Sequence, residues 1–272
     1  MSCVRGNRMP PTRPTSAAPT DVVLLEPMGD GVARLSLNRP EALNALNRAM
    51  ADALETALTR VAAMDDMRVL LVGGRGRAFC AGNDIAEMGQ ITGAEAEALA
   101  RRWGAIMERF AALPQVTIAV VDGHALGGGL MLAVAQDLRI ASDRARFGLP
   151  EVTLGFNPAY GIARLLDVLG GAHGRDLLLT GRRLHATEAL RIGLVNRVVA
   201  AATLAETAAA WAAEMAQMPR EGLAATKEIV AAIRSGKPGG DPAAYGAALR
   251  TGAAARERIR AFVERRRRAP GG

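Results

Sequence analysis

The sequence predicts an α/β fold in which a mainly parallel sheet is followed by a helical C-terminal part. Two short apolar runs, residues 69–72 and 116–121, have the composition of strands that are buried on both faces of a parallel sheet. Stretches with helical periodicity separate them, as expected for crossover connections. Beyond Gly161 the pattern is almost entirely helical. The 272 residues are enough for a sizeable core.

The sheet-rich part begins with a predicted hairpin over residues 22–38, which turns at residues 28–31. Alternation of apolar and polar residues from Val32 to Asn38 predicts that its second strand is half-buried. The other elements predicted for this part are helices at 47–64, 95–113 and 130–135 and a strand at 138–141. Pro114 ends the second of these helices.

The C-terminal part is predicted to be helical at 162–169, 175–179, 187–192, 204–217, 223–234 and 242–267, with one strand at 195–199. Residues 1–20 carry four prolines, three arginines and no acid, which predicts a disordered N-terminal extension. These prolines would break the amphipathic helix of a mitochondrial transit peptide. We expect a core over 21–200 and a helical C-terminal region over 201–272.

Composition excludes several classes of protein. Two cysteines cannot build a disulfide framework or a CxxC metal site, so we expect no metal and a cytoplasmic location. The sequence has no run of 18 apolar residues, so we expect no membrane-spanning helix. The net charge is +7, but it is concentrated at the two ends, where residues 1–20 have no acid and residues 250–272 hold eight arginines against two glutamates. With only nine aromatic residues to stack on bases, the composition argues against nucleic acid as a partner.

Two glycine-containing loops, 73–84 and 122–129, follow the two apolar runs. Neither has the Gly-Lys-Ser/Thr ending of a phosphate loop or the spacing of a dinucleotide-binding turn. The triplet Gly127 to Gly129 opens a helix, whose free N–H groups could hold the negative charge of an oxyanion. The alternative interpretation is that the glycines only allow close packing of helix on strand.

Glu151 is the one carboxylate in an otherwise apolar segment, residues 147–155, that proline and glycine constrain. A carboxylate buried in such a segment would have a raised pKa and could act as a base or an acid near neutral pH. An isolated glutamate is otherwise a solvated or ion-paired residue.

Six motifs occur in the order known from one family. They are NRPEALNAL at 38–46, FCAGNDI at 79–85, DGHALGGG at 122–129, FGLPE at 147–151, LLLTG at 177–181 and ALRIGLV at 189–195. Over nearly all of residues 21–268 the chain resembles the crotonase superfamily, the enoyl-CoA hydratase and isomerase family. The resemblance implies a crotonase-like spiral of repeated ββα units and a helical C-terminal region that forms a homotrimer, or a hexamer as a dimer of trimers.

The resemblance also implies an acyl-CoA substrate whose thioester oxygen accepts hydrogen bonds from two backbone N–H groups. These carry over to Asn83, where the family commonly has alanine or glycine, and to Gly128. The segments that line the adenine and pantetheine in relatives match Ala42, Leu43, Ala81, Asp84 and Ile85. Coenzyme A enters as part of the substrate, and no further cofactor is implied.

The chain departs from the family pattern at the acid and base. Hydratases of the family have two glutamates; one matches Glu151, but the other position is Met131. Because isomerisation needs only one base, we expect an isomerase that converts 3-enoyl-CoA to 2-enoyl-CoA, with Glu151 as the base. A single-glutamate hydratase or dehydratase of β-oxidation is the alternative, and a non-catalytic acyl-CoA- or RNA-binding protein is another.

Other polar residues have simpler interpretations. The loop 155–161 differs from that of typical hydratases, and Tyr160 could place a hydroxyl in the acyl pocket. Asp84 could cap the helix that follows it. Cys80 has no histidine nearby in the sequence to activate it. We expect the three histidines to be structural.

Overall fold

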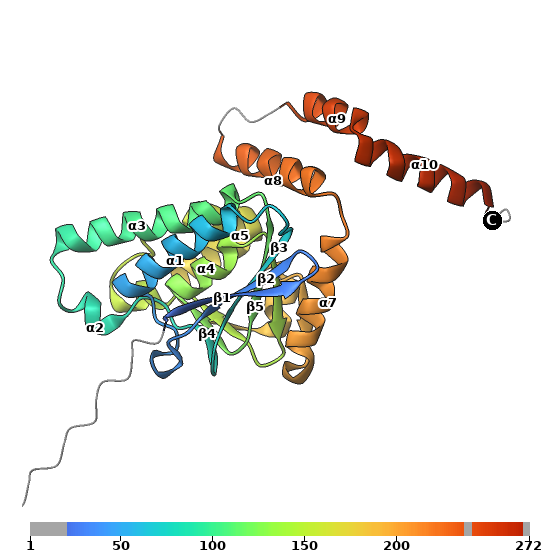
Figure 1. Ribbon diagram of the computed structural model, residues 1–272. Helices are drawn as coiled ribbons and strands as arrows, with labels where there is room; N and C mark the ends of the chain where they lie inside the picture. The colour runs from blue at the N-terminus through green and yellow to red at the C-terminus, as the bar shows by residue number, and fades with distance from the viewer. Residues whose placement is uncertain (1–20, 237–240, 269–272) are drawn as a thin grey trace, which may run out of the picture.

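The computed structural model describes residues 21–236 and 241–268 (Figure 1), so the predicted extension over residues 1–20 lies outside the described residues. A larger sheet organises the chain, with strand order β1-β2-β3-β5-β7-β10. Its strands are β1 (Val23–Gly29), β2 (Val32–Leu37), β3 (Val69–Gly74), β5 (Val116–Val121), β7 (Leu138–Ser142) and β10 (Arg197–Val199). The hairpin β1–β2 is antiparallel and all other pairs are parallel, as the sequence predicts.

A second sheet of four very short strands lies beside the first, in the order β4-β6-β8-β9. The strands are β4 (Ala78–Cys80), β6 (His124–Leu126), β8 (Arg146–Gly148) and β9 (Arg183–His185). β4, β6 and β8 pair in parallel, while β9 runs antiparallel to β8. Each short strand of the parallel set follows a strand of the larger sheet, which gives the repeated strand-strand-helix turns of a crotonase-like spiral.

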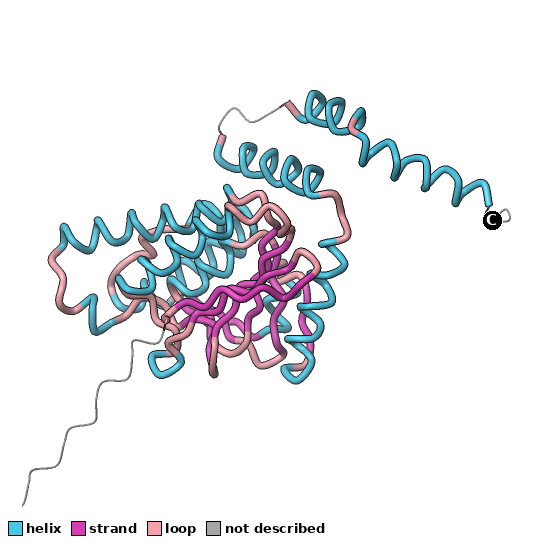
Figure 2. The backbone as a smooth tube through the Cα atoms, in the orientation of Figure 1, coloured by secondary structure: helices cyan, strands magenta, loops and turns pink. Residues whose placement is uncertain are grey.

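Helices cover the two faces of the larger sheet, and Figure 2 shows the strands gathered among helices. The helices are α1 (Arg48–Ala62), α2 (Ile85–Met88), α3 (Gly93–Ala112), α4 (Gly128–Ala135), α5 (Ile162–Thr180), α6 (Ala186–Arg191), α7 (Leu204–Ala216), α8 (Arg220–Ser235), α9 (Pro242–Thr251) and α10 (Ala253–Arg268). Apolar residues of α1, α3 and α4 share one core with the side chains on one face of β2, β3 and β5. The other face packs against α7.

This second core corrects the expectation for the strand at 32–37. Val32 and Ser36 are buried (7% and 3% exposed) although both point away from the main core. The reason is that α7, more than 160 residues later in the chain, packs against this face of the sheet. The strand is therefore buried on nearly all of both faces, and not on one.

In the C-terminal part, one predicted break is present and one predicted helix is divided. Residues 162–180 make up α5, but Gly170 within it is non-helical (φ 68°, ψ 171°), so two helices meet at a kink there, in agreement with the separate helices predicted at 162–169 and 175–179. The single helix predicted for 242–267 is divided into α9 and α10, because Gly252 adopts an extended conformation. α9 and α10 extend away from the sheet-containing body (Figure 1).

Within residues 21–236 and 241–268, no helix is both long enough and apolar enough to cross a bilayer. The same residues contain no group of three or more His, Cys, Asp or Glu side chains placed to hold a metal ion.

Candidate active site

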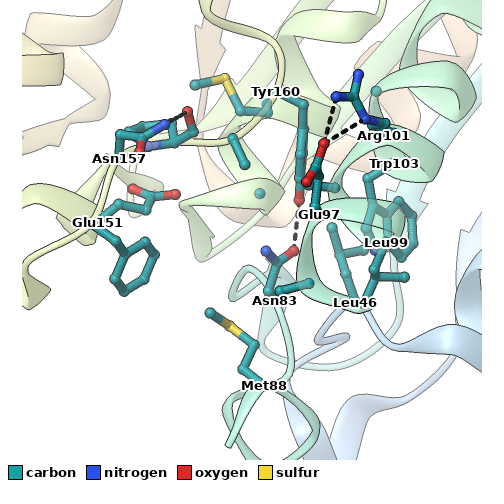
Figure 3. Close-up of a pocket in the computed structure, with 18 of the residues that line it drawn as sticks. Leu46, Asn83, Met88, Glu97, Leu99, Arg101, Trp103, Glu151, Asn157 and Tyr160 are labelled. Atoms are coloured by element: carbon teal, nitrogen blue, oxygen red, sulfur yellow. Dashed lines mark hydrogen bonds and ion pairs between the residues drawn. The ribbon is translucent and has the colours of Figure 1, made fainter. Parts of the chain in front are cut away.

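A cavity of about 630 Å³ opens between α3, the start of α4 and the loops that follow β4 and η2 (Pro150–Leu154). Asn83, Gly128 and Glu151, the three residues predicted to be catalytic, all line it. Figure 3 shows Asn83 and Glu151 at the cavity. Met131 and Tyr160, the two positions at which the chain departs from hydratases, line it as well. The structure thus brings together residues from four separate sequence segments.

The parallel pairing of β4 and β6 explains why Asn83 and Gly128 meet. Cys80 pairs with Ala125, so both strands end at the same edge of the small sheet. Gly82 comes so close to the other loop that a Cβ on it would lie 3.6 Å from the backbone nitrogen of Gly128. The two loops therefore present their backbones to the same side of the cavity.

The backbone N–H of Asn83 is left available by its neighbours. The N–H of Leu46 donates to the oxygen of Gly82 (2.8 Å), and the N–H of Asp84 donates to the oxygen of Leu46 (2.9 Å). Asn83 lies between these two bonds, and its own N–H has no acceptor among the described residues. A free backbone donor at a cavity wall is the element from which an oxyanion hole is built.

The second donor is at the start of α4. Gly127 is the N-cap of this helix and Gly128 its first residue, so the N–H of Gly128 cannot bond within the helix. The third glycine has a different role: a Cβ on Gly129 would collide with the backbone oxygen of Cys80. The triplet thus combines the two interpretations that the sequence left open, with a free donor at Gly128 and close helix-to-strand packing at Gly129.

Glu151 lies on η2, immediately after Pro150. Its Oε2 atom is buried and has no hydrogen-bond partner in the described structure. Burial raises the pKa of this carboxyl group above its ordinary value, because the charged form loses hydration. A carboxylate of this kind is suited to take up and return a proton near neutral pH.

Other carboxylates also line the cavity, but each is paired with an arginine. Asp84 bonds to Arg39 (3.1 Å), Glu87 lies 3.9 Å from Arg48, and Glu97 bonds to Arg101 (2.6 Å). Asp84 in addition accepts a hydrogen bond from the N–H of Ala86, which confirms its predicted role as a helix cap. Among the described lining residues, Glu151 is therefore the one carboxylate without a cationic partner.

Met131 occupies the place of the second glutamate with an apolar side chain. It is 1% exposed and packs close to Gly161, where a Cβ would lie 2.9 Å from the Met131 sulfur. This part of the cavity wall consequently offers neither an acid nor a base.

Tyr160 places its hydroxyl in the cavity, as the sequence suggested. The hydroxyl donates a hydrogen bond to Oδ1 of Asn83 at 2.6 Å. Burial also raises the pKa of Tyr160, so the phenol stays protonated and remains a donor. The pairing with Asn83 joins residues 77 positions apart, and no local pattern in the sequence pointed to it.

The remaining predicted contacts lie outside the cavity lining. Ala42, Leu43 and Ala81 lie on neighbouring segments, where the N–H of Ala81 donates to the oxygen of Leu43 (3.0 Å), and Ile85, the first residue of α2, is 77% exposed. Their contact with the adenine and pantetheine of coenzyme A stays a prediction.

Cys80 lies directly behind this wall and is not a nucleophile, because full burial raises the pKa of its thiol to about 12. His124, His173 and His185 do not line the cavity. Trp103 is 1% exposed and forms part of the cavity wall.

Comparisons with known proteins identify the family of the chain. A family model described as enoyl-CoA hydratase/isomerase matches residues 28–269. A probable enoyl-CoA hydratase of Mycobacterium tuberculosis is 42% identical over 197 residues, which cover 72% of this chain and 76% of that protein. The human mitochondrial enoyl-CoA hydratase domain-containing protein 2 is 44% identical over 172 residues, 62% of this chain and 59% of that protein.

Solved structures give the same result over more of the chain. An enoyl-CoA hydratase subunit of Geobacillus kaustophilus has a TM-score of 0.81 at 34% identity, with 92% of this chain and 97% of that chain covered. An enoyl-CoA hydratase of Mycobacterium smegmatis also has a TM-score of 0.81, at 30% identity, with 90% and 96% covered. The chain therefore belongs to the enoyl-CoA hydratase/isomerase family of the crotonase superfamily.

Proposed function

We propose that this protein is an enoyl-CoA isomerase, which moves a double bond from the 3-position to the 2-position of an acyl-CoA thioester. The proposal rests on the composition of the site. It has one buried carboxylate without a partner, Glu151, and an apolar residue, Met131, where hydratases of the family have their other glutamate. Moving a double bond requires one base that returns the proton it takes, so one carboxylate is sufficient.

The reaction begins with the thioester oxygen between the N–H groups of Asn83 and Gly128. Glu151 removes a proton from C2, and the electron pair of the C–H bond passes to the carbonyl oxygen to form a dienolate. Each preorganised donor typically contributes about 3 to 4 kcal/mol to stabilising such an oxyanion. Glu151 then protonates C4, the double bond forms between C2 and C3, and the carboxylate is regenerated. The cycle neither oxidises nor reduces the substrate, so coenzyme A as part of the substrate is the only cofactor that it needs.

Enoyl-CoA hydration is the second candidate, and the names of several relatives favour it. Addition of water across a double bond is easiest with two carboxylates, one that holds the water and one that delivers the proton. The apolar side chain of Met131 is the reason that we place hydration second.

One assay tests both candidates. The wild-type protein and Glu151→Gln are given a 3-enoyl-CoA and a 2-enoyl-CoA of equal chain length, and double-bond migration and hydration are followed separately. We expect migration with the wild type and a loss of about 10²- to 10⁴-fold with Glu151→Gln. Rapid hydration without migration would overturn the isomerase assignment, and full activity of Glu151→Gln would overturn the assignment of the base.

Glu97→Gln provides the matched control. Glu97 lines the same cavity and undergoes the same change of carboxylate to amide, but it is exposed and paired with Arg101. We expect this variant to keep migration activity within about tenfold of the wild type, since a surface ion pair contributes little.

We also propose that the chain assembles as a homotrimer or a hexamer. Support comes from apolar side chains on α8 and α10 that are exposed in the isolated chain, among them Val230 (58%), Ile233 (74%) and Ile259 (49%). Exposed apolar patches of this kind mark interaction surfaces. Light scattering at micromolar concentration would give three or six times the 28.4 kDa chain mass, and a monomeric mass would overturn the proposal.

A further inference from the structure

The side chain of Asn83 has a capacity for binding that the proposed isomerisation does not use. Its Oδ1 atom accepts the hydrogen bond from Tyr160 at 2.6 Å. In this bond the oxygen end of the carboxamide faces Tyr160, and the phenol is the donor. Figure 3 shows the amide nitrogen on the opposite side, turned toward Glu151.

Tyr160 is well placed to hold the amide in this orientation. It is 9% exposed, and the raised pKa of its buried phenol keeps the donating hydrogen in place. The hydroxyl and Oδ1 of Asn83 also lie directly over Gly128, where a Cβ would meet both of them. The pair consequently sits beside the predicted oxyanion hole, next to the part of the acyl chain nearest the thioester.

The amide nitrogen has no hydrogen-bond acceptor within the described structure. The nearby walls contributed by Leu46 and Met131 are apolar side chains. When an all-carbon acyl chain fills this space, the two N–H donors of the Asn83 amide lose their hydrogen bonds to water and gain no new acceptor. Leaving these donors unsatisfied costs binding free energy. An acyl chain with an oxygen at the right position would satisfy them.

We propose that Asn83, positioned by Tyr160, makes the cavity selective for acyl-CoA thioesters that carry a hydrogen-bond acceptor oxygen at the third or fourth atom of the acyl chain. This rests on the proposed function only in that the cavity binds the acyl part of a CoA thioester. It does not depend on which reaction Glu151 performs.

A second asparagine in the cavity wall shows what makes Asn83 special. The Nδ2 atom of Asn157 donates to the oxygen of the adjacent Pro158 at 2.9 Å, so one of its two N–H groups is already used within the protein. Both asparagines line the same cavity, but the amide nitrogen of Asn157 has an acceptor in the described structure and that of Asn83 has none. Asn157→Ala is therefore a matched control for Asn83→Ala, which keeps the backbone N–H of residue 83.

The test uses saturated ligands, which neither isomerise nor take up water. Methoxyacetyl-CoA and butanoyl-CoA have chains of equal length and differ only by an ether oxygen in place of the methylene at the third atom. 3-Methoxypropanoyl-CoA and pentanoyl-CoA make the same comparison at the fourth atom. Calorimetry gives the dissociation constants of all four ligands with each variant, and the quantity compared is the ratio of ether to alkyl affinity.

We expect that Asn83→Ala lowers this ratio about tenfold for at least one ligand pair, the effect of one hydrogen bond. Tyr160→Phe should lower it about threefold, because the amide can then rotate, while Asn157→Ala should leave it unchanged. If Asn83→Ala weakens ether and alkyl ligands equally, or if Asn157→Ala has the same effect on the ratio, the selectivity proposal is wrong and the proposed function stands. If the wild type binds none of the four thioesters, the acyl-CoA site itself is wrong.

Discussion

The Oε1 atom of Glu151 lies 2.8 Å from the point at which a Cβ on Gly127 would stand. Gly127 also has φ 51° and ψ −126°, a conformation that residues with a side chain rarely adopt. The glycine thus leaves room for the carboxylate and sets the direction of the free N–H that follows.

Gly127→Ala is expected to displace Glu151 and lower kcat for double-bond migration by about 100-fold, since a shift of about 1 Å at a reacting group has an effect of this size. Steady-state kinetics on a 3-enoyl-CoA measures it. The matched control is Gly155→Ala: Gly155 also has a positive φ (87°), but a Cβ there would meet no atom within 4 Å. Both variants carry backbone strain, so an equal loss of kcat in the two would show that strain and not contact with Glu151 is responsible.

The acid side of the pH profile should report Glu151. The base must be ionised to take a proton, so kcat/KM is expected to fall tenfold per pH unit below the pKa of Glu151. Burial raises this pKa, and the midpoint should therefore lie above the ordinary 4.5. The buried phenol of Tyr160 and the thiol of Cys80, with its pKa raised to about 12, should contribute no basic limb below pH 9. A midpoint at or below 4.5 would contradict the burial of the carboxylate.

The same raised pKa makes stability depend on pH in a defined direction. The folded protein binds the Glu151 proton more tightly than the unfolded chain does, so stability falls as pH rises from the unfolded pKa through the folded one. Glu151→Gln removes this dependence. The variant should melt above the wild type at pH 8, and the difference should disappear near pH 4. A difference that is the same at both pH values would trace to packing and not to ionisation.

Periodicity predicted the long elements because each carries several residues on one buried face. The helix expected at 47–64 is α1, and the runs at 69–72 and 116–121 are the central strands β3 and β5. The second sheet was missed by pattern alone, since each of its strands has three residues and no period can be read from so few. The full burial of β2 was missed for another reason: the helix that covers it, α7, is remote in sequence.

The features of the candidate site were likewise predictable only where they depend on local sequence. The glycine triplet and the apolar segment around Glu151 indicated a donor loop and a buried carboxylate from local sequence. The absence of a cationic partner for Glu151, and the pairing of Asp84 with Arg39, depend on contacts between distant segments. The bond between Tyr160 and Asn83 belongs to this second kind, so only the folded chain reveals it.

The attachment of α8 to the sheet-containing body depends on a buried lysine. Lys227 is 8% exposed, and its Nζ atom bonds to Oδ2 of Asp137 and to the backbone oxygen of Gln115, both at 2.7 Å. The same Asp137 oxygen accepts the N–H of Thr117 at the start of β5. One ammonium group therefore joins α8 to the central strand and to the start of β7.

Lys227→Met should lower the free energy of unfolding by about 3 kcal/mol, because it leaves a partly buried carboxylate and a buried carbonyl without their cation. Urea unfolding followed by circular dichroism measures the change. Thr226→Ala, on the exposed side of the same helix, removes only a hydroxyl that bonds within α8 and should change stability by less than about 0.5 kcal/mol. If Lys227→Met were as stable as Thr226→Ala, the other contacts of α8, among them the ion pairs of Arg220 with Asp65 and of Arg234 with Glu108, would be sufficient to hold it in place.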